Sequence, residues 1–329
     1  MSKAVPARRI AVVGAGRMGR GISLSFAFSG YPVQLLDSEE RSPEDFAELA
    51  ESVSREMQTE LQFLQGLQLV SSAQAEIIAT RISVLPRSAA VQALVDVEFV
   101  FEAVAELLEV KQSTYQWLNS VLPDTAVIGS TTSTILVDTL AEFIEVKSRF
   151  LNTHWLNPAL LMPLVEMSPG QHRSEDAVTA MQGLLESIGK QPIICSASPG
   201  FIVPRIQALA MTEAARCVEE GVASAEDVDK AVRLGFGVRY AVLGLLEFID
   251  WGGGDIVYYA TQYLAGALDD KRFSVPEVIE KNMRENRNGI RDGQGFYDYR
   301  DRDVDAYREE RLGDFVKLLQ HLSLLPEAK

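Results

Sequence analysis

A cluster of glycines near the start of the chain limits its fold more than any other feature. The segment Gly14-Ala15-Gly16-Arg17-Met18-Gly19 follows an apolar run at residues 10–13 and precedes a helix-like run at residues 22–29. A strand, a glycine-rich turn and a helix in this order predict a dinucleotide-binding unit. Gly14 permits the turn, Gly16 lets backbone N–H groups near Arg17 and Met18 reach the pyrophosphate, and Gly19 lets the helix pack closely.

An acidic residue stands where such a unit binds the adenosine ribose. The apolar run at residues 33–36 ends in Asp37, 23 residues after Gly14. A carboxylate there accepts bonds from the ribose hydroxyls and repels a 2′-phosphate, which favours NAD over NADP, although Arg41 lies close by. The alternative is a glycine-rich turn in another kind of α/β protein, with Asp37 as a solvated strand end.

The composition is that of a globular protein and excludes several classes of function. The 329 residues are 47% hydrophobic, enough for two domains with sizeable cores. A formal net charge of −15 argues against nucleic acid or an anionic membrane as the main partner. Cys195 and Cys217 give no disulfide framework, and the N-terminus has no apolar core of a signal peptide. We therefore expect a cytoplasmic protein, and we predict no metal site.

Alternating strand and helix patterns run to about residue 199. Residues 43–85 have helical spacing interrupted at Gly66, which predicts a helical hairpin with its second helix near residues 72–80. Apolar runs predict strands at 97–102, 126–130, 150–154, 164–167 and 192–195. This alternation predicts an α/β fold with a Rossmann-type, doubly wound parallel sheet in residues 1–199.

The pattern changes after Ser198-Pro199-Gly200. Strand signals fade, and residues 201–221 form a long amphipathic pattern that ends at Gly221. A second helix is predicted from Ala225, with Ser224 as its N-cap. We therefore expect residues 200–329 to form an all-helical domain for substrate binding and dimerisation.

Polar residues that can carry chemistry follow the predicted strands. Ser133 lies in the hydroxyl-rich turn 130–134, His154 follows one strand, and Glu166 closes another. Glu106 and Lys111 come after the strand at 97–102. Because ligands of open α/β sheets bind beyond the carboxyl ends of the strands, these side chains are expected to meet at the site.

These motifs, in this order, resemble those of the NAD-dependent L-3-hydroxyacyl-CoA dehydrogenase family. The matching segments span nearly the whole chain and are the turn at 130–134, His154-Trp155-Leu156-Asn157-Pro158, Pro163-Leu164-Val165-Glu166, Ser198-Pro199-Gly200-Phe201-Ile202-Val203 and Asp292-Gly293-Gln294-Gly295-Phe296-Tyr297. The resemblance implies oxidation of a 3-hydroxyacyl-CoA thioester with NAD, as in fatty acid metabolism, by a homodimer.

The resemblance also implies a role for each polar residue. His154 would remove the hydroxyl proton while hydride leaves for the nicotinamide, because the ordinary pKa of imidazole lies near neutrality. Glu166 would accept a bond from the other ring nitrogen and stabilise the imidazolium. Ser133 would bond the reacting oxygen. Contacts with NAD are implied for Glu106, Lys111, Ser133, Asn157 and Arg291.

Simpler explanations exist for several of these residues. A single histidine before a tryptophan is often a hydrogen-bonded core residue, and the hydroxyls at 130–134 are suited to cap the next helix. Arg291 is equally suited to a surface salt bridge. His172 and His321 are expected to be ordinary surface residues.

Two departures from the family pattern leave three functions open. Pro204 stands where the family has an asparagine near the substrate, and proline offers neither a side-chain donor nor an N–H. The family's hairpin carries basic residues for the CoA phosphates, whereas residues 42–86 here hold seven acids and two bases, Arg55 and Arg81. The hypotheses are oxidation of a CoA thioester, the same chemistry on a non-CoA hydroxy acid or related alcohol, and an NAD-binding protein that has lost turnover.

Overall fold

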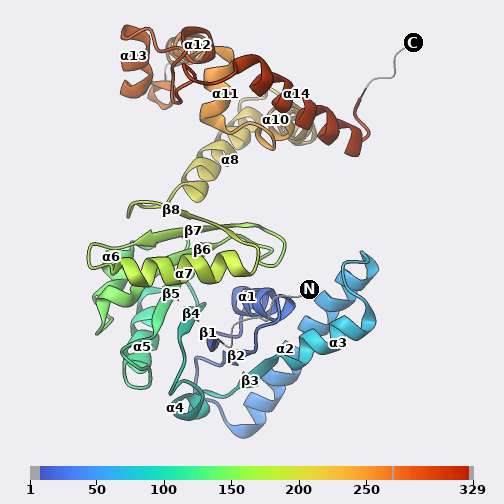
Figure 1. Ribbon diagram of the computed structural model, residues 1–329, viewed down its shortest axis with the longest axis vertical. Helices are drawn as coiled ribbons and strands as arrows, with labels where there is room; N and C mark the ends of the chain where they lie inside the picture. Colours follow the sequence, from blue (N-terminus) through green and yellow to red (C-terminus); the bar gives the residue numbers. More distant parts are fainter. Residues whose placement is uncertain (1–7, 269, 326–329) are drawn as a thin grey trace. The chain divides into compact units, whose positions relative to one another are not determined.

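The chain forms two compact units, Met1–Ala210 and Met211–Lys329 (Figure 1). The computed structural model describes residues 8–268 and 270–325. The division falls within helix α8 (Val203–Glu219), whereas the sequence pattern changes a few residues before this helix.

An eight-stranded sheet forms the centre of the first unit. Its strand order is β3-β2-β1-β4-β5-β6-β7-β8, and every neighbouring pair is parallel except β6 with β7. The order reverses direction between β1 and β4, as in a doubly wound fold, so the predicted Rossmann-type sheet is confirmed. The strands are β1 (Ile10–Val13), β2 (Val33–Leu36), β3 (Ile82–Leu85), β4 (Phe99–Glu102), β5 (Val127–Ser130), β6 (Phe150–Trp155), β7 (Leu164–Pro169) and β8 (Gln191–Ile194).

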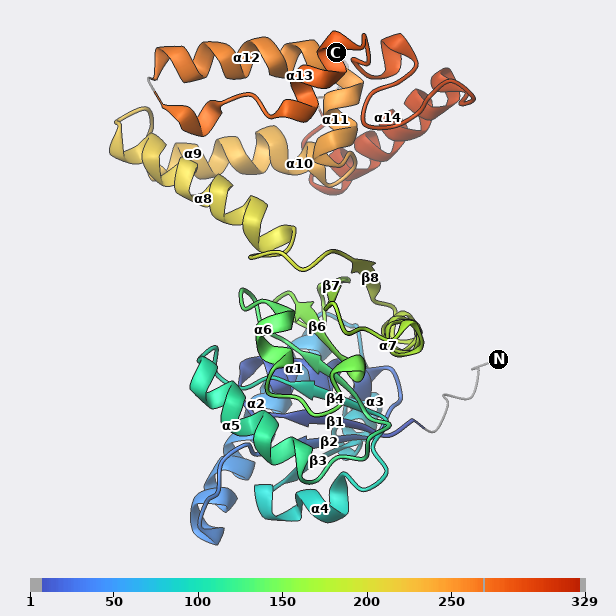
Figure 2. The same ribbon diagram turned by 90° about the vertical axis from the view of Figure 1, so that its left-hand side faces the viewer.

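Helices cover both faces of the sheet (Figure 2). One face packs against α1 (Arg17–Phe28), α2 (Pro43–Gly66) and α7 (Glu175–Ser187). The other face packs against α4 (Ala90–Ala93), α5 (Leu108–Asn119) and α6 (Val137–Ala141). The remaining helix, α3 (Ser72–Thr80), shares a separate apolar cluster with α1 and α2.

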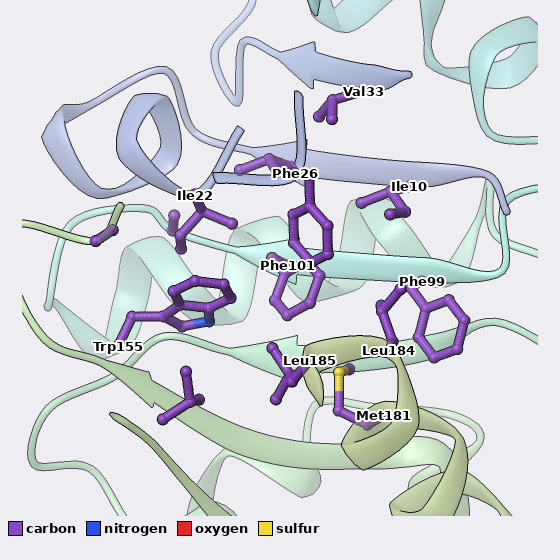
Figure 3. Packing of buried hydrophobic residues seen from close by; sticks show 14 of the residues in the cluster. Ile10, Ile22, Phe26, Val33, Phe99, Phe101, Trp155, Met181, Leu184 and Leu185 are labelled. Carbon is purple, nitrogen blue, oxygen red and sulfur yellow. The ribbon is translucent and has the colours of Figure 1, made fainter. Parts of the chain in front are cut away.

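Aromatic rings from three elements meet in the core on the α1 side of the sheet (Figure 3). Phe26 of α1, Phe101 of β4 and Trp155 of β6 lie with ring centroids 5.2 to 6.0 Å apart. Tilted and edge-on contacts of this kind stabilise a core beyond the burial of apolar area. Trp155 is a core residue, and it fixes the end of β6 directly beside His154.

The predicted helical hairpin is present, but one strand within its range was wrongly predicted as helix. α2 ends at Gly66 and α3 begins after Ser71, whose hydroxyl caps the helix. Strand β3, however, starts only two residues after α3 ends and pairs with β2. Because β3 is a four-residue, half-exposed edge strand with no glycine or proline before it, its residues continue the helical pattern in the sequence.

The second unit is helical. Besides the rest of α8 it contains α9 (Ala225–Ala231), α10 (Val238–Tyr240), α11 (Leu245–Gly252), α12 (Gly254–Ala267), α13 (Glu277–Arg284) and α14 (Val304–His321), with a π-helical turn joining α9 to α10. Ser224 caps α9 as predicted, and Gly253, at φ 109°, separates α11 from α12. Within the described ranges, no helix is both long and apolar enough to span a bilayer.

Candidate active site

The glycine turn joins β1 to α1 in the geometry that its sequence predicts. Gly14 has φ +105°, and a Cβ on it would lie 2.7 Å from the carbonyl oxygen of Ala103. At Gly19, a Cβ would overlap the carbonyl oxygen of Gly14, so this glycine sets the closeness of α1 to the turn. Gly16 is the N-cap, and no side chain caps the first N–H groups of α1. The turn therefore leaves these donors for an anion.

A cleft of about 390 Å³ lies against this turn. It runs along the carboxyl ends of the central strands, where a doubly wound sheet binds its ligand. Its lining includes the turn itself, Arg20, Asp37, Arg41, Leu49 and the segment 103–105. These residues fit a dinucleotide, because they offer a pyrophosphate cradle at one end and an acid at the other.

Asp37 is buried at the end of β2 and is already paired. Its carboxylate accepts a 2.7 Å hydrogen bond from Nε of Arg41 and a 3.1 Å bond from the backbone N–H of Glu39. The bond to Asp37 raises the pKa of Arg41 above its ordinary value. Asp37, the acid expected to bind the ribose hydroxyls, is thus in place, and one of its oxygens is bonded to Arg41.

His154 and Glu166 face each other across the antiparallel pair β6–β7. They are register partners, and Nδ1 of His154 lies 2.7 Å from Oε2 of Glu166. Both side chains are buried, and the ring of Phe201 stacks on the imidazole with centroids 5.6 Å apart. Cross-strand neighbours on one face of a sheet come close in this way, so twelve residues of separation bring the two groups together.

The second oxygen of Glu166 caps helix α8. Its Oε1 accepts backbone N–H bonds of 2.9 Å from Ile202 and 2.8 Å from Val203, at the start of the helix. These bonds fix the carboxylate and place its charge at the positive end of the helix dipole. We did not predict this contact from the sequence. The only hint in the sequence is indirect: neither Ile202 nor Val203 has a side-chain oxygen that could cap the helix.

Glu106 organises the hydroxyl-rich turn. Its Oε1 accepts bonds from Oγ1 of Thr132 (2.5 Å) and from the backbone N–H groups of Ser133 (2.9 Å) and Thr134 (3.2 Å). Burial alone raises the pKa of Glu106, but the Thr132 hydroxyl, the Lys111 charge and the two N–H groups outweigh it, so the pKa lies below its ordinary value. The turn does not cap the next helix, since α6 begins only at Val137. Ser133 itself is exposed.

Lys111 lies behind this turn and not on its surface. The side chain is fully buried, and Nζ lies 2.8 and 3.0 Å from the two oxygens of Glu102 and 3.4 Å from Glu106. Direct contact between Lys111 and a cofactor, which we expected from the resemblance, does not fit this geometry. We did not predict a role for Glu102, although an acid at the end of an otherwise apolar buried strand is a signal for one.

The remaining predicted site residues are more loosely placed. Asn157 is exposed in the segment that follows β6. Arg291 lies in the second unit, where its guanidinium is 2.8 Å from Asp255. It thus forms a salt bridge, which was our alternative to a contact with NAD. His172 and His321 are exposed, as expected. Pro204 lies in the first turn of α8, where proline is tolerated. The described residues contain no cluster of acids, histidines or cysteines suited to a metal ion.

Two family models match consecutive parts of the chain. The NAD binding domain of 3-hydroxyacyl-CoA dehydrogenase matches residues 9–198, and the C-terminal domain of the same enzyme matches residues 200–299. Together they cover most of the sequence.

Individual proteins are similar over nearly the full length. A 3-hydroxybutyryl-CoA dehydrogenase of Bradyrhizobium diazoefficiens is 30% identical, over 89% of this chain and 96% of its own. A 5-formyl-3-hydroxy-2-methylpyridine 4-carboxylate 5-dehydrogenase of Mesorhizobium japonicum is 28% identical, over 94% and 96%. The crystal structure of a 3-hydroxyacyl-CoA dehydrogenase from Archaeoglobus fulgidus superposes with a TM-score of 0.75 at 31% identity, over 97% of this chain and 100% of that one.

Proposed function

Since the chain belongs to the 3-hydroxyacyl-CoA dehydrogenase family, we propose that it oxidises a 3-hydroxyacyl substrate with His154 as the base and Glu166 as its partner. The protein is an NAD-dependent dehydrogenase that acts on a CH–OH group. The observation that carries the proposal is the 2.7 Å contact between His154 and Glu166, with Glu166 held in place by two backbone N–H groups.

The geometry defines what each side of the imidazole can do. Nδ1 of His154 donates to the carboxylate of Glu166, which leaves Nε2 with a free lone pair. Bound NAD supplies the acceptor for the hydride that leaves the carbinol carbon. Nε2 takes the hydroxyl proton, and the charge of Glu166 stabilises the imidazolium that forms. In the reverse direction, His154 returns this proton to the oxygen.

Ser133 and Glu106 are assigned to the nicotinamide half of NAD, because they follow β5 and β4 at the carboxyl edge of the sheet, next to the glycine turn. The backbone of Ser133 is fixed by Glu106, while its side chain remains exposed and able to bond the reacting oxygen. The charged carboxylate of Glu106 suits a ribose hydroxyl. The first N–H groups of α1, near Arg17 and Met18, suit the pyrophosphate. Contacts of Asn157 and Arg291 with NAD remain predictions.

A 3-hydroxyacyl-CoA is the first substrate to test. We expect NADH formation from 3-hydroxybutyryl-CoA and longer thioesters, measured by absorbance beside free 3-hydroxy acids at equal concentration. Turnover of the thioester supports the first proposal. Turnover of free 3-hydroxy acids alone would show that the substrate is not a CoA thioester, while the proposed oxidation by His154 and NAD would stand. No turnover of either class, with NADH still bound, favours a protein that has lost turnover.

One observation favours a non-CoA substrate as the second candidate. The hairpin α2–α3 is acidic, and it offers few cations: Arg81 donates a 2.8 Å bond to the carbonyl of Ala27, and Arg55 is exposed, 4.0 Å from Glu51. A focused site for CoA phosphates would therefore have one exposed arginine on a hairpin that carries seven acids. The relative from Mesorhizobium japonicum, whose name denotes a pyridine carboxylate substrate, supports the same alternative.

We also propose a cytoplasmic homodimer. Ile256, Tyr259 and Tyr263 form one face of α12 at helical spacing and are 60%, 62% and 74% exposed, which suits an apolar contact with a second copy. Both cysteines are free, as in a reducing compartment. Sedimentation of the purified protein tests the dimer, and charged substitutions on this face of α12 are expected to yield monomer.

A further inference from the structure

A fully buried charged network lies directly behind Glu106. It consists of Glu102 at the end of β4, Lys111 and Tyr115 on α5, and Ser130 at the end of β5; we call these four residues the Glu102 network. The proposed chemistry uses none of them directly. Buried charges are costly unless they are paired, so their presence needs a reason beyond packing.

Glu102 is saturated with hydrogen bonds. Its carboxylate accepts from Nζ of Lys111, from the hydroxyl of Tyr115 at 2.5 Å, from Oγ of Ser130 at 2.6 Å and from the backbone N–H of Val104 at 2.9 Å. Burial and the neighbouring charge of Glu102 raise the pKa of Tyr115 well above its ordinary value, so this hydroxyl remains a donor. A carboxylate bonded in this way has one orientation.

The network holds both segments that meet at Glu106. On one side, Oγ of Ser130 donates to the carboxylate of Glu102, and the backbone N–H of Thr131 donates to the carbonyl of Glu102. These two bonds fix the start of the hydroxyl-rich turn. On the other, the bond to Val104 fixes the start of the loop that carries Glu106. Nζ of Lys111 lies between the two acids, 2.8 Å from Glu102 and 3.4 Å from Glu106.

We propose that Glu102, Lys111 and Tyr115 are positioning residues for NAD: they hold Glu106 and the turn at Ser133 in place, and Lys111 acts through Glu106 without touching the cofactor. The inference rests on the proposed contact between Glu106 and NAD. Two acids share one lysine, so the cluster keeps an excess negative charge, and Glu106 is its exposed acid. Loss of any member lets Glu106 and the turn move.

NADH binding, followed by fluorescence titration without any alcohol substrate, tests the inference. Tyr115→Phe removes one hydroxyl and keeps the ring that packs on Phe150. We expect it to weaken NADH binding about fivefold, which corresponds to ~1 kcal/mol. Lys111→Met is expected to weaken it more than about tenfold, because it leaves Glu102 buried without its cation. Thr114→Val is the matched control, since Thr114 is a buried residue of α5 whose hydroxyl donates to the carbonyl of Val110 in the same helix.

A double-mutant cycle separates positioning from direct contact. In a Glu106→Gln background, Tyr115→Phe is expected to cause no further loss of NADH affinity. A purely structural role would lower the melting temperature of Tyr115→Phe and leave NADH binding at 25 °C equal to that of Thr114→Val, which would overturn the inference. Loss of binding in Lys111→Met alone, with Tyr115→Phe unchanged, would also overturn it, because Lys111 would then contact NADH directly.

The same titrations distinguish this inference from the proposal beneath it. If Glu106→Gln binds NADH as tightly as the wild type, the contact between Glu106 and NAD is wrong, and the positioning role falls with it. If Glu106→Gln binds weakly and Tyr115→Phe does not, only the positioning role is wrong. Should Lys111→Met fail to fold, Tyr115→Phe and its cycle with Glu106→Gln still decide the question.

Discussion

Replacing Glu166 with glutamine tests the proposed base in a defined way. Oε1 of Glu166 accepts two backbone N–H bonds at the start of α8, and Oε2 faces Nδ1 of His154. A glutamine in the same position must keep its oxygen toward the two N–H groups, so its NH₂ group faces His154. Nδ1 then has to accept a bond, and the proton moves to Nε2. The imidazole is held in the tautomer that cannot take a proton from the alcohol.

The expected loss is large, although the change is small. An acid-to-amide change behind a catalytic histidine in a Ser-His-Asp protease lowers kcat by about 10⁴-fold, through the same change of tautomer. We expect Glu166→Gln to lower kcat by about 10³- to 10⁴-fold, or ~4 to 5.5 kcal/mol of barrier. Stability should change little, because the caps on α8 remain. Glu166→Ala is the contrast, since it loses both caps and leaves a cavity, at a cost of about 2 to 4 kcal/mol.

Steady-state NADH formation and thermal melting of the two variants give the answer together. The account predicts that Glu166→Gln melts close to the wild type, binds NADH normally and is nearly inactive. Activity within about tenfold of the wild type would refute the proposed tautomer argument, because a loss of that size is what one neutral hydrogen bond explains.

Three further changes follow from the structure. Gly19→Ala places a Cβ on the carbonyl of Gly14, so NADH binding should be lost, whereas Gly66→Ala at the open end of α2 should bind NADH normally; titration compares the two. Asp37→Ser releases Arg41 from its 2.7 Å bond. In kinetic assays it should raise KM for NAD and improve kcat/KM for NADP. An unchanged preference for NAD over NADP would contradict the role of Asp37 in binding the ribose. Lys190→Met removes three bonds of 2.6 to 3.0 Å to the carbonyls of the loop after β6. Urea unfolding should show a loss of about 2 to 4 kcal/mol in the free energy of unfolding. A loss near zero would contradict a stabilising role for these three bonds.

The parts of the site that the sequence predicts are those set by local geometry. The turn from Gly14 to Gly19, Asp37 after β2, and the contact of His154 with Glu166 depend on one strand end, one helix start and one strand pair. The glycine turn and the acid after β2 have a fixed spacing, so they can be recognised without coordinates, whereas the contact of His154 with Glu166 was implied by the family resemblance. Roles for these residues in catalysis rest on the resemblance and stay predictions.

What the sequence did not show depends on contacts between distant segments. Glu166 caps a helix 36 residues further along the chain, and Ser130 bonds to Glu102 over 28 residues. No spacing rule connects such pairs. The burial of Lys111 was missed for a related reason, since lysine is rarely buried and only the folded sheet reveals the acid that pairs with it. Strand β3 was missed because a short edge strand lacks a period of its own.

The central claim is that His154 removes the proton during NAD-dependent oxidation of an alcohol. The most direct measurement is NADH formation by His154→Ala, on whichever substrate the wild type turns over, beside its NADH affinity from titration. The account predicts NADH binding within about twofold of the wild type and a kcat lower by at least about 10²- to 10⁴-fold, the usual contribution of a positioned general base. An unchanged kcat in His154→Ala would contradict the account.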